Sequence, residues 1–261
     1  MNMDQPESRN QGSKASPRVV GAAPAGADDE ASAAAAVRDM FNSIAPKYDL
    51  LNHVLSMNVD RLWWNRTART FQALLSRPAV RVLDLCCGTG DMTSALYRQT
   101  NGGATRMVGV DFSHEMLLRA RDKTRGEPLR WVEADALNLP FDQGQFDLVT
   151  AAFGFRNLAN YDRGLTEIFR VLGEGGEVGI LDFGEPKGLI GAGYRIYFRK
   201  VLPAIGTVIS GVKGPYAYLP RSVQRFPAPE EMLDRMRAAG FRDVSWTPYT
   251  FGIAGLYRGR K

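Results

Sequence analysis

The sequence predicts an α/β fold, in which an open, mostly parallel sheet of seven strands carries helices on both faces. From Val80 onward, short apolar runs alternate with amphipathic segments, as in strands joined by crossover helices. The chain ends in two closely spaced strand-like segments, separated at Pro248, which indicate an antiparallel hairpin at the sheet edge. We expect strands near 80–86, 106–110, 129–134, 146–151, 177–182, 243–248 and 251–257, and helices near 91–99, 114–123, 161–171 and 229–239.

A tail and a helical cap precede the first strand. Residues 1–36 are rich in Ser, Gly, Pro and Ala and poor in large apolar side chains, so we expect a disordered tail. Residues 37–261 then form the folded domain, with a helical cap over 37–78. The first helix of the cap is predicted from apolar residues at helical spacing, before a stop at Pro46: Val37, Met40, Phe41 and Ile44.

An insertion over 187–227 separates the fifth and sixth strands. Lys187–Arg225 carries seven basic residues and no acidic one, among many apolar and aromatic side chains. It could be an extra helix pair packed on the core with a solvated basic face. We favour a lid, whose apolar side receives a greasy substrate and whose basic side meets anionic lipid, because so long an acid-free stretch is uncommon.

Composition excludes several classes of protein. No apolar run approaches the about 20 residues that span a bilayer, and the N-terminus does not resemble a signal peptide. The two cysteines are adjacent, and only two histidines accompany them, so we expect no metal site and a cytoplasmic, reduced protein. The net charge is +5, with −2 on residues 1–36 and +7 on the rest. We find no run of Lys and Arg with interleaved aromatics of the kind that supports RNA binding, so we expect no nucleic acid partner.

The stretch Val80–Asp91 is the centre of the predicted site. An apolar strand leads into Cys-Cys-Gly-Thr-Gly-Asp and then a helix start, an arrangement whose backbone amides can hold a nucleotide. The dinucleotide fingerprint needs three glycines, but Cys86 occupies the first position and Thr93 the last. The pattern therefore disfavours an NAD oxidoreductase and suits S-adenosylmethionine, which has no pyrophosphate.

Polar groups follow the next strands at the same edge of the sheet. Asp111 ends the second strand, where a carboxylate can accept hydrogen bonds from ribose hydroxyls. Asp135 and Ala136 follow the third strand, where a carboxylate can accept from an adenine amine. Phe153–Asn157, Phe-Gly-Phe-Arg-Asn, follows the fourth strand and forms a credible reaction site. Within it, Arg156 acts either on the substrate or as a structural ion-pair partner.

Two longer motifs identify a family that the chain resembles. The first motif is met by Tyr48, Asp49, Asn52, Leu55, Ser56 and Trp63, with departures at Leu51 and Asp60. The second is met by Arg170, Val171, Gly175 and Gly176, with a departure at 182–184. Further matching blocks are 153–157, 218–222 and 226–227. Over about 37–258, the chain resembles the ubiquinone/menaquinone biosynthesis C-methyltransferases, which belong to the class I S-adenosylmethionine-dependent superfamily with a Rossmann-like sheet.

The resemblance implies methyl transfer from S-adenosylmethionine to a ring carbon of a polyprenyl quinol. Together with the glycine loop, it gives these cofactor-binding candidates: Asp84, Gly88, Thr89, Gly90, Thr93, Asp111, Phe112, Asp135, Ala136 and Ala152. The family usually has serine at the position of Ala152, so a hydroxyl contact is missing there. The catalytic candidates are Arg156 and Asn157, with Tyr48 and Asp49 second. Arg156 would stabilise the quinol oxyanion or orient a water that takes its proton. Asp60 replaces a histidine, which puts any acid–base role at that position in doubt.

The acceptor that we expect is demethylmenaquinol, with a benzoquinol of ubiquinone synthesis, or both quinols, as the alternative. A non-catalytic nucleotide-binding regulator is the alternative from another class. An RNA methyltransferase is disfavoured because the basic stretch is too apolar. We expect peripheral contact with the inner face of the membrane, and the oligomeric state stays open, with a homodimer among the options.

Overall fold

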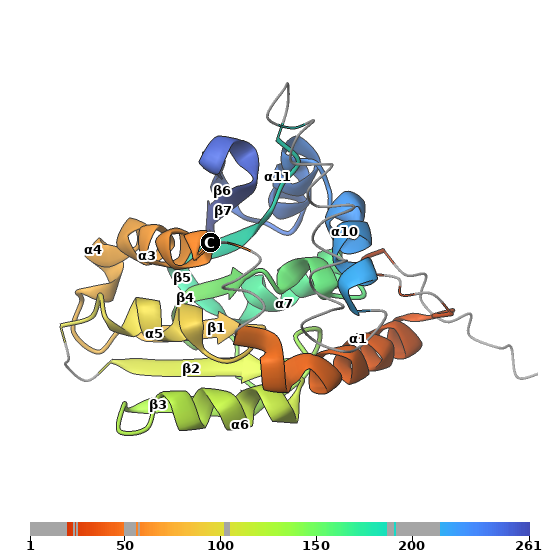
Figure 1. Cartoon of the computed structure of the whole chain (residues 1–261). Coiled ribbons are helices and arrows are strands. Elements are labelled where there is room, and N and C mark those ends of the chain that lie inside the picture. Colours follow the sequence, from red (N-terminus) through yellow and green to blue (C-terminus); the bar gives the residue numbers. More distant parts are fainter. Residues whose placement is uncertain are drawn as a thin grey trace, which may run out of the picture.

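The protein is described here by a computed structural model, which covers residues 20–22, 24, 26–49, 56, 58–101, 105–186, 191 and 215–261. Seven strands form one sheet in the order β3-β2-β1-β4-β5-β7-β6 (Figure 1). Their bounds are β1 Arg81–Leu85, β2 Arg106–Asp111, β3 Leu129–Glu133, β4 Phe146–Ala152, β5 Leu172–Phe183, β6 Arg242–Tyr249 and β7 Ala254–Arg260. The first five are parallel, and β7 runs antiparallel to both β5 and β6. The predicted sheet and its edge hairpin are confirmed.

Helices cover both faces of the sheet (Figure 1). Adjacent residues of β1 point to opposite faces: Val82 packs with the side of α3, α4 and α5, and Leu83 with that of α7 and α11. The bounds of these helices are α3 Val59–Thr70, α4 Gln72–Leu75, α5 Asp91–Tyr97, α7 Tyr161–Val171 and α11 Pro229–Ala238. α6 (His114–Lys123) lies against β2 and β3, and Ser113 caps its N-terminus as predicted.

The structure contradicts the predicted end of the disordered tail at residue 36. Helix α1 spans Glu30–Ile44, and a capping box between Asp29 and Ser32 begins it. Ala33 is fully buried in the core, and Gly21 and Ala22 donate backbone hydrogen bonds to the 158–159 segment. A stretch rich in alanine lacks the large apolar side chains that mark a packed segment, yet alanine has the highest helix propensity of all residues. The composition therefore concealed a packed helix.

Two strand boundaries also differ from the prediction. β5 begins at Leu172 rather than at 177, because the Gly-rich segment that follows α7 is already paired with β4 through an irregular register. Pro248 lies inside β6 and does not separate two strands. β6 is the edge strand of the sheet, where the missing N–H of a proline costs little. The turn η4 (Thr250–Gly252) joins β6 to β7 instead.

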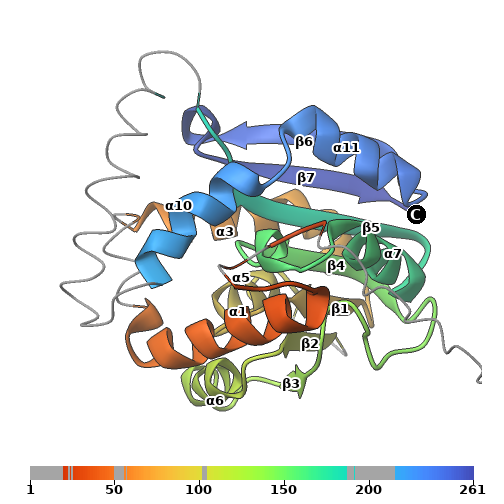
Figure 2. The same ribbon diagram turned by 90° about the vertical axis from the view of Figure 1, so that its right-hand side faces the viewer.

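The insertion predicted as a lid lies mostly outside the described residues, which resume with α10 (Pro215–Arg225). α10 and α1 are neighbours, and α10 also contacts η2 (Phe155–Asn157) at the end of β4 (Figure 2). Among the described residues, no helix has the length and apolar character that crossing a membrane requires.

Candidate active site

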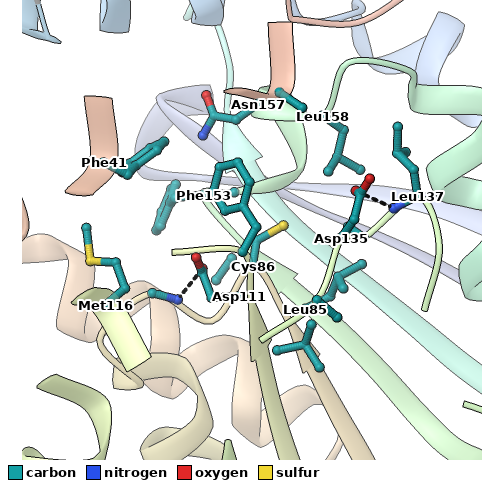
Figure 3. A pocket seen from close by; sticks show the side chains of 18 of the residues that line it. Phe41, Leu85, Cys86, Asp111, Met116, Asp135, Leu137, Phe153, Asn157 and Leu158 are labelled. Atoms are coloured by element: carbon teal, nitrogen blue, oxygen red, sulfur yellow. Dashed lines mark hydrogen bonds between the residues drawn. The ribbon is translucent and has the colours of Figure 1, made fainter. Parts of the chain in front are cut away.

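A pocket of about 710 Å³, including space open to solvent, lies beyond the carboxyl ends of the parallel strands (Figure 3). Residues after β1, β2, β3 and β4 form its floor and walls, and α1 contributes Ala34 and Phe41. The lining includes eight of the predicted site residues: Tyr48, Gly88, Asp111, Phe112, Asp135, Ala136, Ala152 and Asn157. This is the position where open α/β sheets bind ligands.

Gly88 and Asp111 form one end of the pocket. The backbone N–H of Gly88 donates to Asp111 Oδ2 at 2.9 Å, and that of Ser113 donates to Oδ1 at 2.9 Å. Gly88 has a φ of +54°, and a Cβ there would lie in ordinary van der Waals contact with the Tyr48 ring, at 3.8 Å. Burial raises the pKa of Asp111 to about 6. The positive φ is a backbone conformation that glycine adopts readily.

Asp135 and Phe112 lie on the walls of the same pocket. Asp135 Oδ1 accepts from the N–H of Leu137 at 2.9 Å, which orients a solvent-accessible carboxylate toward the cavity (Figure 3). The Phe112 ring lies 6.4 Å from the Phe41 ring of α1, centroid to centroid. An acceptor for amine hydrogens beside apolar surface suits a purine base.

Asp84 and Thr93, two predicted cofactor contacts, are not among the residues that line the pocket. Both side chains are fully buried, and Asp84 accepts from Thr93 Oγ1 at 2.6 Å and from Thr150 Oγ1 at 2.8 Å. Burial raises the pKa of Asp84 to about 6. These bonds tie β1 to α5 and β4, so the two side chains shape the glycine loop from behind. Gly90 has a φ of +85° and packs toward the Trp131 ring.

Asp49 and Thr89 belong to a polar cluster outside the pocket lining. Thr89 Oγ1 donates to Asp49 Oδ1 at 2.5 Å, and Lys123 Nζ donates to Asp49 Oδ2 at 2.9 Å. Lys123 also pairs with Asp91 at 2.8 Å. The cluster fastens the segment after α1 to the glycine loop and to α6. The sequence does not predict this role of Lys123, because locally it is only a basic residue at the end of a helix.

Arg156 takes the structural alternative that its sequence position left open. Its side chain is 7% exposed and forms an ion pair with Asp182, at 2.9 Å from Nη1 to Oδ1. Nη1 also donates to the backbone carbonyl of Phe153, and the guanidinium lies 5.0 Å from the centre of the Phe183 ring. In the described structure Arg156 is not among the residues that line the pocket, and its ion pair connects the segment after β4 to β5.

Asn157, the neighbour of Arg156, does line the pocket. The Tyr218 hydroxyl from α10 donates to Asn157 Oδ1 at 3.2 Å. Burial raises the pKa of Tyr218 to about 12, which keeps this hydroxyl protonated at neutral pH. The Asn157 amide nitrogen is turned toward the cavity (Figure 3). This orientation leaves a hydrogen-bond donor on the pocket side of Asn157.

The chain matches the model of the ubiE/COQ5 methyltransferase family over residues 29–261. Its relatives include a demethylmenaquinone methyltransferase from Deinococcus radiodurans, 49% identical, with 87% of this chain and 92% of that one covered. A demethylmenaquinone methyltransferase from Thermus thermophilus is 48% identical, with 84% of this chain and 99% of that one covered. A ubiquinone/menaquinone biosynthesis C-methyltransferase from Geobacter sulfurreducens is 43% identical, with 86% and 88% covered.

The chain belongs to the ubiE/COQ5 methyltransferase family. It has the class I S-adenosylmethionine-dependent methyltransferase fold: a methyltransferase from Thermotoga maritima has a TM-score of 0.60 at 20% identity, with 85% of this chain and 99% of that one covered. The [4+2]-cyclase SpnF, at 18% identity, has a TM-score of 0.63 with 86% and 94% covered. Since a cyclase shares the fold, the architecture alone does not fix the reaction.

In this ubiE/COQ5 family member, the second sequence motif has a structural role. Arg170 donates to the carbonyls of Phe141 and Leu139 at 2.7 and 3.0 Å and pairs with Glu167 at 2.8 Å. These bonds hold the loop that leads from β3 to β4. Arg170, the first residue of the motif, therefore supports a wall of the pocket from the outside, since Ala136 and Leu137 belong to that loop.

Proposed function

We propose that this protein is an S-adenosylmethionine-dependent C-methyltransferase that converts demethylmenaquinol into menaquinol. The observation that carries the proposal is the identity of 48–49%, over nearly the full length, to two proteins named demethylmenaquinone methyltransferase. The name of the Geobacter relative includes ubiquinone synthesis as well, so a benzoquinol is the second candidate acceptor.

The pocket has the features that S-adenosylmethionine requires. Asp111 would accept from the ribose hydroxyls, Asp135 from the adenine amine, and the pocket beside Gly88 would admit the amino acid part. Bound there, S-adenosylmethionine supplies an activated sulfonium methyl group. The protein then has to align donor and acceptor and exclude water.

The acceptor ring would lie near Phe153 and Asn157, at the end of β4. Both residues line the pocket, and a planar quinol ring can pack on the Phe153 ring. The ring carbon becomes nucleophilic when the neighbouring hydroxyl loses its proton, and a phenol has a pKa of about 10. The Asn157 amide would donate to that oxygen, and Tyr48, which also lines the pocket, is the second candidate for this contact. Asn157 therefore replaces Arg156 as our first catalytic candidate.

The direct test is methyl transfer from labelled S-adenosylmethionine to chemically reduced demethylmenaquinone, beside a matched benzoquinol precursor. We expect transfer to the naphthoquinol, and transfer to both would indicate a role in both pathways. Asn157→Asp should lower kcat at least about tenfold with little change in cofactor affinity, because a carboxylate repels the oxyanion. Tight cofactor binding without transfer to either quinol would contradict the proposal and favour another acceptor or a regulator.

A further inference from the structure

The turn η4 carries an exposed apolar side chain that the site does not use. Phe251 is 76% exposed, the most exposed of the large apolar residues in the described structure. It lies between Thr250 and Gly252, and all three residues have positive φ, at 44°, 58° and 88°. A bulky residue rarely adopts this conformation, and each such residue is strained. The protein thus holds an aromatic ring in solvent at a cost in stability.

Helix α3 continues this apolar feature. Leu62 is 66% exposed on the outer side of α3, whose inner side is buried through Trp63 and Thr67. The Trp63 indole donates to Thr250 Oγ1 at 2.8 Å, which joins the helix directly to the turn. α3 and the dark blue turn at the β6–β7 end lie side by side (Figure 1). Leu62 lies one helical turn before Arg66, and the Arg66 guanidinium packs on the ring of Tyr249 directly before the turn. Leu62 and Phe251 therefore both lie near the contact between α3 and the turn.

Three exposed arginines share helix α3 with Leu62. Arg61, Arg66 and Arg69 are exposed on α3, and Arg66 lies 4.1 Å above the ring of Tyr249, which precedes the turn. The acidic residue of this helix, Asp60, is buried. Even with the exposed Glu185 near the turn, the described part of this surface is positively charged. We call Arg61, Leu62, Arg66, Arg69 and Phe251 the α3–turn face.

We propose that the α3–turn face docks on an anionic lipid surface, with Phe251 and Leu62 inserted at the boundary between headgroups and acyl chains. Exposed apolar side chains near several arginines are the composition of such interfaces. The charge argues against a second copy of the chain, because a two-fold contact would bring the arginines of both copies together.

The face also has a direct structural connection to the pocket. The Trp63 ring lies 5.7 Å from the Phe153 ring, and Phe153 lines the pocket. The Phe183 ring completes the cluster at 4.6 Å from Phe153, centroid to centroid. Docking at this face would bring the aromatic wall of the site next to the membrane, where a polyprenyl quinol resides. This last step rests on the proposed function, whereas the docking itself does not.

The test is flotation with vesicles of phosphatidylcholine alone or mixed with phosphatidylglycerol, without any quinol. We expect binding to the anionic vesicles that weakens with salt. Phe251→Asn should weaken it about tenfold or more through lost apolar burial. Asn tolerates positive φ, so this variant should unfold at no lower temperature than the wild type. Arg61→Gln with Arg69→Gln should weaken binding on the order of 20-fold, at about fivefold per arginine. The matched controls are Leu118→Gln and Arg121→Gln on the exposed side of α6, which should bind like the wild type.

Methyl transfer separates the two proposals. The docking variants should still methylate a quinol with a shortened, water-soluble side chain. They should no longer methylate a long-chain quinol in vesicles. Docking is wrong if the wild type does not bind anionic vesicles, or if Phe251→Asn and the arginine variant bind as it does. It is also wrong if these variants abolish a dimer in sedimentation while vesicle binding persists. Absence of transfer to the soluble quinol in the wild type would instead contradict the proposed reaction.

Discussion

Asp84 illustrates how a single buried residue controls the loop that forms the site. It is fully buried, accepts hydrogen bonds from two threonines, and its pKa is raised from 3.8 to about 6 because burial outweighs those bonds. An acid whose pKa is raised by folding favours the folded state below its unfolded pKa, and this contribution is lost as the pH rises through the folded pKa. At neutral pH the ionised Asp84 therefore lowers the free energy of unfolding.

We predict that Asp84→Asn flattens the pH dependence of stability. In the wild type, ionisation of Asp84 should lower the free energy of unfolding between pH about 4 and 6, by on the order of 3 kcal/mol for a shift of about two units. The variant lacks this titration. Urea unfolding of both proteins across this window is the measurement, and parallel pH profiles would show that Asp84 does not carry the effect.

A second prediction separates the structural from the catalytic role of Arg156. Arg156→Met or Asp182→Leu alone should lower the free energy of unfolding by about 3–5 kcal/mol, because each leaves an unpaired buried charge. The double variant should recover most of that loss. If the double variant is stable, binds S-adenosylmethionine and turns over within about tenfold of wild type, Arg156 is a positioning residue. A stable double variant without turnover would restore Arg156 as a catalytic residue.

At the scale of elements, α1 is the part of the fold that composition concealed. It contributes Ala34 and Phe41 to the pocket, and the buried Glu30 at its start accepts from Asn160 Nδ2 at 2.7 Å and pairs with Arg163. The helix thus bridges the pocket and the segment that follows β4. Residues assigned to a tail are part of the site.

We predict that a chain starting at residue 37 is less stable than one starting at residue 20, by about 3 kcal/mol or more. The shorter chain loses the capping box, which costs about 1 kcal/mol. It also leaves Asn160 without its buried partner, which costs about 1–3 kcal/mol. It should also bind S-adenosylmethionine more weakly, because Ala34 is removed. Thermal unfolding and calorimetric titration of both chains test this, and equal stability would mean that α1 is dispensable.

A polar cluster around Lys123 links three other elements. Lys123 on α6 pairs with Asp49 after η1 (Ala45–Lys47) and with Asp91 at the start of α5. We predict that Lys123→Met speeds S-adenosylmethionine dissociation several-fold, because Tyr48 is then held less firmly over Gly88. Partly exposed ion pairs contribute little to folding, so the free energy of unfolding should change by less than about 1 kcal/mol. Stopped-flow kinetics measures the dissociation rate of S-adenosylmethionine. The control is Arg125→Gln, which changes another basic residue close to α6.

For the whole molecule, the pocket joins the ends of four strands with α1, so ligand binding should stabilise the entire fold. We predict that S-adenosylmethionine at about 100 times its Kd raises the free energy of unfolding by about 2.7 kcal/mol. Asp111→Ala should reduce this gain at the same ligand concentration, because it removes the acceptor beside Gly88. Thermal shift assays with both proteins provide the test, and an undiminished gain in the variant would place the ribose elsewhere.

The sequence predicted the features that depend on local pattern. Apolar runs and glycines fix the order and direction of the strands, and the polar residues that follow them necessarily meet at one edge of a parallel sheet. For this reason Gly88, Asp111, Asp135 and Asn157 could be assigned to one site, and in the structure all four line the same pocket. Their contacts with a ligand are predictions for the experiments above.

The tertiary structure decided which side of the backbone each remaining side chain faces, and what it meets there. Asp84 and Thr93 have the right positions in sequence, but they point into the core and bond to each other. Arg156 is neutralised by Asp182, which lies 26 residues away on β5, and Lys123 meets Asp49 across 74 residues. Pairings over such separations depend on how helices and strands pack, and no local pattern encodes them. The sequence by itself therefore determined the family, the sheet and the edge where the site lies. Packing determined which residues reach the pocket and which hold it from behind.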